Sequence, residues 1–358
     1  MDLSDYTFCP DLARASTIPA RWYTDPAFLE AERRRVFGRT WQAVGRAESV
    51  AQPGSYLAGE IAGEPVLVAR GKDGGLRAFS NVCRHRGAVM AEGAGQASVI
   101  RCPYHAWTYS LDGSLLGTPE FDGVEDWDRS AACLPRFQVE TWGPFVFVNQ
   151  DSGGPALREV LGAIPDEIAS FGCPFERMRL SYRRDYIVEC NWKVYIDNYL
   201  EGYHIPVAHP GLLRELDYSQ YRVETFRYYS SHIGPIRART SDAGPRRYAF
   251  ADSSRNALYY WIFPNFMLNI YPDNLSSNII LPLAPERTLT IFEWFGFSGE
   301  VAQATIDFSD EIQQEDIRLC ESAQRGLRSR HYKQGRFSVK RENGVHHFHG
   351  LLWEFLRD

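Results

Sequence analysis

The chain has 358 residues and a mass of 40.9 kDa, more than one hydrophobic core usually holds, so we expect two domains. Hydrophobic residues make up 44% and charged residues 23%, a composition that excludes a disordered chain. The net charge of −6, with no basic cluster, argues against nucleic acid as a partner. Aromatic residues reach 14%, which fits an aromatic-lined cavity or simply β-rich cores.

The start of the chain, Met1 to Tyr6, has neither a basic stretch nor an apolar run, so we expect no secretory signal. No apolar run approaches the roughly 18 residues of a membrane span. Seven cysteines fit reduced thiols better than a disulfide framework. We therefore expect a cytoplasmic protein without a membrane partner.

Residues 1–40 are expected to be a helical segment, because Asp25 precedes Pro26 and a run of helix formers, a typical helix start. In residues 41–150, short β-type runs such as Glu64–Arg70 and Phe145–Asn149 alternate with glycine turns. This alternation of short strands and turns predicts a small antiparallel β domain. The Gly- and Pro-containing stretch 151–155 is a plausible boundary.

Residues 151–358 mix both kinds of element. We expect helices at about 192–204 and 300–325 and strands around 259–271, 277–283 and 288–297. Because the strands and helices are segregated, this part is predicted to be an α+β domain rather than a series of alternating βαβ units.

Two short pairs in the β region carry metal-ligand chemistry. Cys83 and His85 lie on one predicted turn, and Cys102 and His105 lie on another. Two facing turns of this kind can clamp a binuclear cluster, with two thiolates on one iron and two imidazoles on the other, as in Rieske [2Fe–2S] centres. Trp107 can shield such a cluster. A structural zinc site is the alternative, but zinc spacings usually pair Cys with Cys and His with His.

The segments Asn81–Gly87 and Cys102–Tyr109 resemble the cluster motif of Rieske non-haem iron oxygenase large (alpha) subunits. Ala106 stands where this family most often has glycine, a small departure. The resemblance implies that the chain binds a Rieske [2Fe–2S] cluster through Cys83, His85, Cys102 and His105.

A second constellation combines Glu201, His204 and His209. On a helix Glu201 and His204 would share a face, and Pro206 would break the helix so that His209 returns from a loop. Two imidazoles need a carboxylate to complete the 2-His-1-carboxylate face that leaves open positions on Fe(II) for oxygen. Taken alone, the two histidines are equally typical of buried structural residues.

The region around these histidines resembles the iron-binding part of the same oxygenases, in the segments Asn191–Lys193, Asp197–Tyr199 and Tyr203–Gly211. The resemblance implies that His204 and His209 bind mononuclear Fe(II), with Asp316 as third ligand. Other acids near Asp316 fit a solvated helix face, namely Asp310, Glu311 and Glu315.

The resemblance extends from Trp41 to Phe355, and residues 324–349 are most similar to choline monooxygenase and the carnitine and glycine betaine oxygenases. It implies an α+β fold: a small antiparallel β Rieske domain at 41–150 and a catalytic domain at 151–358 with a central antiparallel sheet covered by helices. Segment 1–40 is expected to pack on the catalytic domain. The C-terminal histidines form no closed set with a carboxylate, so we interpret them as structural or surface residues.

By this resemblance the chain is the terminal oxygenase of a multicomponent system that uses O2. It has no nucleotide fingerprint, so electrons are expected from a separate NAD(P)H-dependent reductase, with or without a ferredoxin. A homotrimer or a trimer-based oligomer is expected, since a ring closes head-to-tail contacts. An electron-transfer Rieske protein would leave the second site unused, and a structural zinc protein would be colourless.

The substrate is expected to be a small quaternary ammonium compound that is hydroxylated or N-dealkylated, with aromatic rings around the cation. The aromatic residues that could form this cage include Tyr259, Phe266 and Phe292. The six candidate substrate contacts are Tyr199, Tyr203, Tyr260, Trp261, Phe263 and Trp294. The same rings suit an aromatic compound, and its hydroxylation or dihydroxylation is the alternative.

Glu201 occupies a position that is usually Asp in this family, although Glu also occurs there in the carnitine branch. In a head-to-tail ring we expect Glu201 to accept hydrogen bonds from His204 of its own chain and from His105 of the neighbour. This contact would couple cluster and iron, which belong to different domains. Asp197, one helical turn earlier, is the competing bridge.

Overall fold

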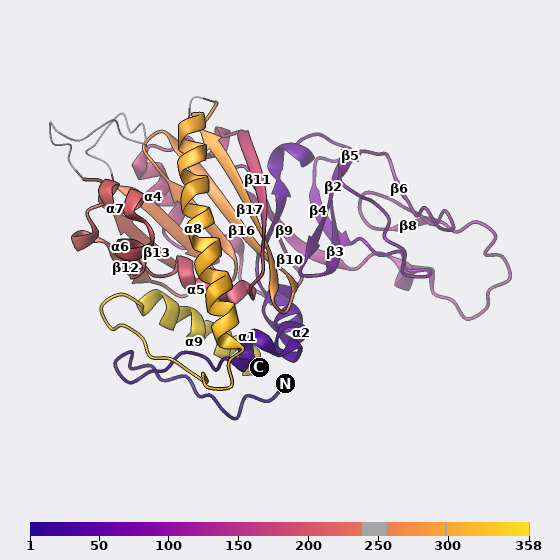
Figure 1. The fold of residues 1–358 in the computed structure, drawn as a ribbon. Coiled ribbons are helices and arrows are strands. Elements are labelled where there is room, and N and C mark those ends of the chain that lie inside the picture. The colour runs from indigo at the N-terminus through magenta and orange to yellow at the C-terminus, as the bar shows by residue number, and fades with distance from the viewer. Residues whose placement is uncertain (238–255, 298, 358) are drawn as a thin grey trace. The chain divides into compact units, whose positions relative to one another are not determined.

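The structure, a computed structural model, describes residues 1–237, 256–297 and 299–357. The chain divides into two compact units (Figure 1). One unit is Phe37–Leu157, called the β unit below. The other unit combines Met1–Val36 with Arg158–Asp358 and is called the mixed unit. Within the described residues, no helix has the length and apolarity needed to cross a bilayer.

The β unit is built on a seven-stranded antiparallel sheet of order β1-β10-β9-β4-β3-β2-β5 and a three-stranded sheet of order β6-β7-β8. The strands expected at 64–70 and 145–149 are confirmed as β3 and β10. The strand bounds are β1 Gln42–Arg46, β2 Ser55–Ile61, β3 Glu64–Arg70, β4 Leu76–Ser80, β5 Ala94–Gln96, β6 Ile100–Arg101, β7 Thr108–Tyr109, β8 Leu115–Gly117, β9 Arg136–Trp142 and β10 Phe145–Asn149.

The mixed unit contains a second seven-stranded antiparallel sheet, of order β11-β17-β16-β15-β14-β13-β12. The expected strand region 259–271 forms two strands, because the chain turns at 263–265 and the Trp261 Nε1–H donates to the carbonyl of Pro264 at 3.0 Å. The bounds are β11 Leu180–Val188, β12 Arg222–Thr225, β13 Tyr229–Gly234, β14 Ala257–Ile262, β15 Phe266–Ile270, β16 Asn274–Ala284 and β17 Arg287–Gly296.

Helices cover this sheet, with the long helix α8 lying along one face beside α5 (Figure 1), so the α+β architecture is confirmed. Asp25 caps α2 as expected, since its carboxylate accepts the N–H of Ala27 at 2.9 Å. The bounds are α1 Arg21–Thr24, α2 Pro26–Arg35, α3 Leu157–Leu161, α4 Ile164–Phe171, α5 Trp192–Tyr199, α6 Ile205–Ala208, α7 Pro210–Glu215, α8 Gln303–Leu327 and α9 Asn343–Arg357.

A buried ion pair ties the N-terminal segment to α5. Lys193 Nζ lies 2.6 Å from Glu32 Oε1, and both side chains are fully buried. The Trp192 Nε1–H donates to the other Glu32 oxygen at 2.7 Å. Removing either charge alone would leave its partner buried and uncompensated, which costs about 3–5 kcal/mol. The position of α5 therefore depends on α2.

Candidate metal centres

Two loops of the β unit share one backbone pattern. In the loop Cys83–Ala88 the first N–H donates to the last carbonyl at 2.8 Å, and the N–H of Gly87 donates to the first carbonyl at 3.0 Å. The loop Cys102–Trp107 repeats both bonds, at 2.8 and 3.1 Å, with Ala106 in the place of Gly87. The two loops therefore place their cysteines equivalently, whereas His85 is the third residue of its loop and His105 the fourth.

The fifth residue of each loop has a left-handed backbone. Gly87 has φ +72° and Ala106 has φ +59°. Glycine adopts this region without strain, whereas an alanine there costs roughly 1–2 kcal/mol. The alanine noted in the sequence thus lies at the one backbone position of its loop where glycine has a physical advantage.

The side chains of these loops form a set of sulfur and nitrogen donors. The thiols of Cys83 and Cys102 are both 3% exposed, and the rings of His85 and His105 lie 4.7 Å apart between centroids. The Nδ1 atom of His85 is buried and has no hydrogen-bond partner among the described residues. Two buried thiols with an orphaned imidazole nitrogen fit a metal–sulfur cluster well.

Aromatic side chains surround this donor set. Trp107 stacks on His85 with 4.9 Å between ring centroids. The Tyr109 hydroxyl accepts the N–H of Arg84 at 3.1 Å and lies 3.6 Å from the sulfur of Cys83. Tyr104, in contrast, is 57% exposed. Aromatic side chains of the β unit therefore cover the donor set on its inner side, while the tip of the loop Cys102–Trp107 is exposed to solvent.

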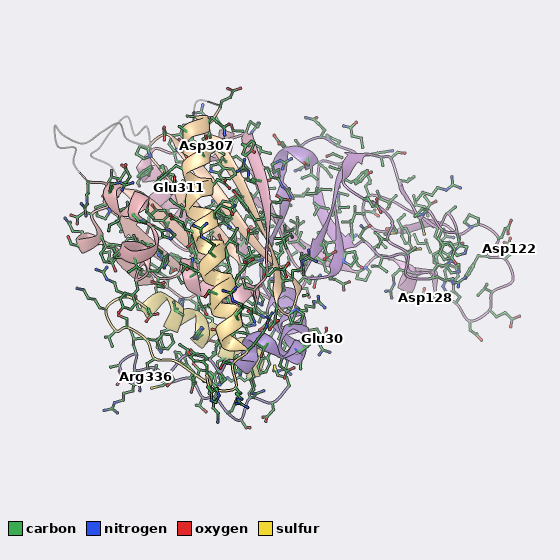
Figure 2. All side chains as sticks on the ribbon, viewed as in Figure 1. Glu30, Asp122, Asp128, Asp307, Glu311 and Arg336 are labelled. Carbon is green, nitrogen blue, oxygen red and sulfur yellow. The ribbon has the colours of Figure 1, made fainter. Side chains whose placement is uncertain are left out.

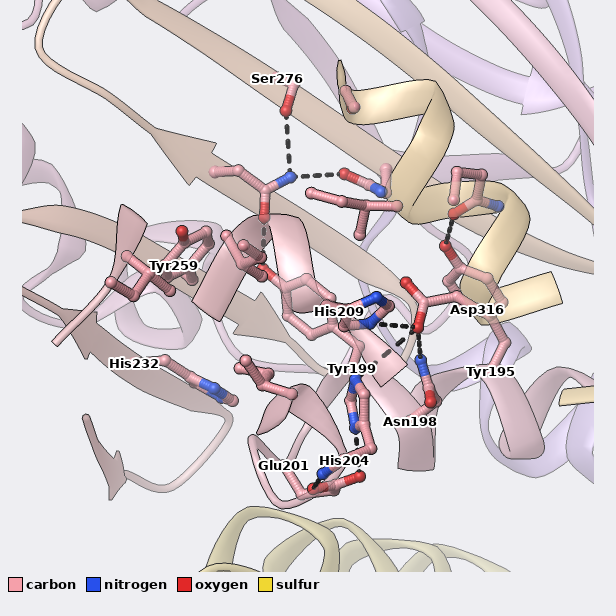
Figure 3. A pocket seen from close by; sticks show the side chains of 18 of the residues that line it. Tyr195, Asn198, Tyr199, Glu201, His204, His209, His232, Tyr259, Ser276 and Asp316 are labelled. Atoms are coloured by element: carbon pink, nitrogen blue, oxygen red, sulfur yellow. Dashed lines mark hydrogen bonds and ion pairs between the residues drawn. The ribbon is translucent and has the colours of Figure 1, made fainter. Parts of the chain in front are cut away.

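The second donor set lies in the mixed unit, where His204, His209 and Asp316 converge (Figure 3). Their donor atoms all lie within 4.8 Å of one another. Asp316 Oδ1 lies 3.0 Å from His209 Nε2 and 3.7 Å from His204 Nε2. The three residues predicted as iron ligands are thus brought together, and two nitrogens and one carboxylate suit Fe(II).

Each histidine uses its other ring nitrogen to contact a glutamate. His204 Nδ1 donates to Glu201 Oε1 at 2.5 Å, and His209 Nδ1 donates to Glu315 Oε2 at 2.6 Å. Such carboxylates fix the orientation of a metal-binding imidazole. The interpretation of Glu315 as part of a solvated face is therefore wrong. Sequence could not reveal its role, because only the tertiary fold brings His209 beside α8.

Asn198 is a further residue that sequence reasoning missed. Its amide donates to Asp316 Oδ1 at 2.7 Å and so orients this carboxylate. Burial alone would lower the pKa of His209, but its hydrogen bonds to Asp316 and Glu315 outweigh burial, so the pKa is raised. The electrostatic environment therefore favours positive charge at this point, as a cation site requires.

Glu201 and His204 lie in a turn rather than on a helix, because α5 already ends at Tyr199. The Glu201 carboxylate accepts the backbone N–H groups of Tyr203 and His204. Gly202 lies so close to Tyr221 that an added Cβ would meet its ring at 2.7 Å. The expected shared helix face is thus corrected to a turn that Glu201 itself holds together.

Asp197 has its own partners inside the mixed unit. Its two oxygens accept hydrogen bonds from the Tyr23 hydroxyl, at 2.6 Å, and from His349 Nε2, at 3.0 Å. Because His349 is fully buried on α9, the reading of this C-terminal histidine as structural agrees with its contacts. Asp197 thereby links α5 to the N-terminal segment and to α9.

A cavity of about 130 Å³ opens beside His204, His209 and Asp316 (Figure 3). Of the six predicted ring residues, Tyr199 lines it. The other described aromatic lining residues, apart from the histidines, are Tyr195, Tyr221, Tyr259, Tyr271 and Phe292. The volume is small compared with the roughly 300–1,000 Å³ of drug-sized sites, so the ligand is expected to be small.

The remaining five predicted ring residues do not line this cavity. Tyr203 is 58% exposed, and Tyr260 lies on the opposite sheet face, where its hydroxyl donates to Glu167 at 2.6 Å. Trp261 and Phe263 pack under α9, with ring centroids 5.4 Å from Phe348 and 5.0 Å from Phe355, and Trp294 packs on Tyr182 at 5.6 Å. Successive residues of a strand point to opposite faces of the sheet, so Tyr260 faces away from the cavity that Tyr259 lines.

The sheet face under the cavity carries a polar row. His232, Tyr259, Asn269 and Ser276 are direct partners on four adjacent strands, and all four line the cavity. Burial lowers the pKa of His232 to about 3, so this histidine is neutral near pH 7. Neutral polar groups therefore form the floor of the cavity.

The chain matches two known protein families. Residues 40–128 match the Rieske [2Fe-2S] domain, and residues 175–357 match the catalytic domain of ring hydroxylating alpha subunits. The carboxylate–histidine sets described above fall within the second match.

Two known proteins are similar over nearly the whole chain. The chloroplastic choline monooxygenase of Arabidopsis thaliana is 36% identical over 97% of this chain and 84% of its own. The carnitine monooxygenase oxygenase subunit of Escherichia coli (strain K12) is 34% identical over 98% of this chain and 96% of its own.

Solved structures of similar proteins share the fold of this chain. The quaternary ammonium Rieske monooxygenase CntA in complex with L-carnitine superposes with a TM-score of 0.82 at 31% identity, covering 97% of both chains. Naphthalene 1,2-dioxygenase with bound indole gives a TM-score of 0.75 at 18% identity, covering 96% of this chain and 92% of that one. The latter similarity shows the fold alone.

Proposed function

Because the chain belongs to the Rieske non-haem iron oxygenase alpha subunits, we propose that it is a terminal oxygenase that hydroxylates or N-dealkylates a small quaternary ammonium compound. The observation that supports this substrate most directly is the cavity beside the two histidines. Aromatic rings and the carboxylates of Glu201 and Asp316 line it, and its described lining includes no lysine or arginine. Such a surface attracts a cation.

We assign Cys83, Cys102, His85 and His105 as ligands of the [2Fe–2S] cluster and His204, His209 and Asp316 as ligands of mononuclear Fe(II). With both groups bound, the cluster supplies electrons and the iron activates oxygen for insertion into a C–H bond. Electrons enter from a separate NAD(P)H-dependent reductase, with or without a ferredoxin.

The protein's own residues prepare this site. Asn198 and Glu315 hold Asp316 and His209 in place, so the donor atoms need little rearrangement on metal binding. Burial raises the pKa values of Tyr199 and Tyr259 well above 10, so both phenols that line the cavity stay neutral. The cavity thus holds the substrate next to the iron by its charge and shape.

A panel assay tests the proposal. The purified protein with a surrogate reductase is offered choline, L-carnitine, glycine betaine and a set of aromatic acids, and NADH-dependent oxygen uptake is compared with product formed. We expect coupled turnover with quaternary ammonium compounds only. Coupled turnover of the aromatic acids alone would exclude the proposed substrate class and favour aromatic hydroxylation.

We further propose that the protein works as a homotrimer or trimer-based ring in which Glu201 accepts a hydrogen bond from His105 of the neighbouring copy. Glu201 already accepts one from His204, and the exposed Tyr104 beside His105 leaves the cluster loop open to a partner. Asp197 is the competing candidate: its oxygens accept hydrogen bonds from Tyr23 and His349, as those of Glu201 do from its own turn.

Single-turnover experiments test this bridge. Glu201→Gln should keep the iron content and the cluster absorbance, but a pre-reduced cluster should no longer be oxidised when substrate and oxygen are added. Asp197→Asn is the matched comparison and should retain cluster oxidation. Normal cluster oxidation in Glu201→Gln would contradict the bridge and leave this residue with only the orientation of His204.

A further inference from the structure

The floor of the cavity includes three neighbouring polar residues on β15 and β16, Asn269, Ser276 and Asn278, whose hydrogen bonds are nearly complete. The Asn269 amide accepts from the Tyr199 hydroxyl at 2.9 Å and donates to Ser276 Oγ at 3.1 Å and to Asn278 Oδ1 at 2.7 Å (Figure 3). All three floor residues, Asn269, Ser276 and Asn278, are at most 8% exposed. Asn269 thus uses both its N–H groups and its oxygen within the floor.

Asn278 and Ser276 keep unused hydrogen-bonding capacity toward the cavity, which both line. Within the described residues the amide nitrogen of Asn278 donates no hydrogen bond, and the Ser276 hydroxyl only accepts one, from Asn269. Together they offer donors and an acceptor side by side on β16. A ligand hydroxyl, which both donates and accepts, matches this combination.

Buried polar residues on a central strand do not help the sheet to fold. Asn278 lies opposite Phe292, and Ser276 lies opposite Trp294, so apolar side chains would pack well at both positions. Polar residues at positions where an apolar side chain would pack better are expected at functional sites. The floor is therefore a candidate recognition surface.

The charges around the cavity also determine which charges a ligand can carry. The carboxylates of Glu201, Glu315 and Asp316 contribute −3, and a divalent iron would bring the sum to −1. No lysine or arginine belongs to the described lining, and His232 is neutral near pH 7. A cationic head is therefore favoured, whereas a buried carboxylate tail would have no positive partner among the described lining residues.

We propose that the floor formed by Asn269, Ser276 and Asn278 selects a quaternary ammonium substrate with an uncharged hydroxyl tail, as in choline, over one with a carboxylate tail, as in glycine betaine. This inference rests on the proposed function. The aromatic walls hold the ammonium head, and Asn278 and Ser276 bind the tail hydroxyl.

Titration calorimetry on the anaerobic holoprotein tests the selection. Choline and glycine betaine differ chiefly in the tail, and we expect choline to bind at least about tenfold more tightly, which corresponds to roughly 1.4 kcal/mol. Tetramethylammonium, which has no tail, should bind more weakly than choline. If glycine betaine binds as tightly as choline, the selection is refuted while the proposed function stands.

Two variants test the assigned residues. Asn278→Leu should weaken choline about 2- to 12-fold, the range for one net hydrogen bond, and leave tetramethylammonium within about twofold. Asn278→Asp keeps the acceptor that Asn269 uses but adds a negative charge, so it should further increase the preference for choline over glycine betaine. Equal effects of Asn278→Leu on choline and tetramethylammonium would show that Asn278 does not bind the tail.

Ser277→Ala is the matched control. Ser277 lies between the two floor residues on β16, is fully buried, and does not line the cavity. This variant should bind all three ligands like the unaltered protein. If no quaternary ammonium compound binds to the unaltered holoprotein, the proposed function fails together with the inference, and the calorimetry separates this result from a lost preference.

Discussion

The two proposed metal centres are built in different ways. The cluster loops of the β unit each supply one cysteine and one histidine within three or four residues, on backbone turns that share the same two hydrogen bonds. The iron site instead joins a turn after α5, the start of α7 and the middle of α8, and Asp316 lies more than 100 residues from either histidine. Local geometry defines the first centre, and side-chain contacts across the fold define the second.

The sharpest test of this contrast removes one ligand from each centre. Asp316→Asn should abolish substrate oxidation and lower the iron content from about three to about two atoms per chain, with the cluster absorbance unchanged. Cys102→Ser should remove the visible absorbance and leave roughly one iron atom. Loss of both metals in either variant would mean that the centres are not independent.

The second test concerns the glutamate that sequence reasoning misjudged. Glu315→Gln should reduce iron affinity or turnover about 10- to 100-fold, because it weakens the contact that orients His209. Asp307→Asn, at an exposed position two turns earlier on α8 (Figure 2), is the control and should behave like the unaltered protein. Equal activity of both variants would show that the iron site does not depend on this contact.

The third test uses pH. His232 has a pKa of about 3 in the folded protein against 6.5 for the ordinary side chain, so the unfolded chain binds its proton first as pH falls. Stability should therefore be lost below about pH 6.5, by roughly 2 kcal/mol between pH 7 and pH 5. Denaturant unfolding of His232→Gln should show a correspondingly smaller loss over this range. An identical pH dependence in both proteins would contradict the burial of a neutral His232.

The smallest expected effect concerns the backbone of the cluster loops. Ala106→Gly should stabilise its loop by about 1 kcal/mol, and Gly87→Ala should destabilise the equivalent loop by about 1–2 kcal/mol. An added Cβ at Gly87 meets no atom within 4 Å, so only its backbone conformation opposes alanine there. Thermal loss of the cluster absorbance reports both changes. Shifts of the same sign in the two variants would show that the loops are not equivalent.

The contrast also explains what the sequence could predict. The strand Glu64–Arg70 and the two Cys/His pairs could be predicted because a short apolar run between turns and the spacing of metal ligands are patterns of only a few residues. Helix α5 was expected to extend to His204, but the side chain of Glu201 holds a turn there, and no propensity rule anticipates that contact.

Residues that work through the tertiary fold were the ones that sequence reasoning missed. Asn198 acquires its role only when α5 packs beside α8, and Glu315 only when the fold brings His209 beside α8. Most of the predicted ring residues were misplaced for a related reason: aromatic content predicts a lined cavity but does not tell which face of β14, or which part of that face, each ring occupies.

The chain order of the two units has a consequence for synthesis on the ribosome. The β unit is complete once residue 157 has emerged, but α2 and its buried Glu32 must wait for Lys193 and for α9, which ends at Arg357. At about 5–20 residues per second, the remaining 200 or so residues take roughly 10–40 s. The N-terminal segment with α2 is therefore synthesised first but forms its native contacts among the last. Its apolar face is exposed throughout that interval.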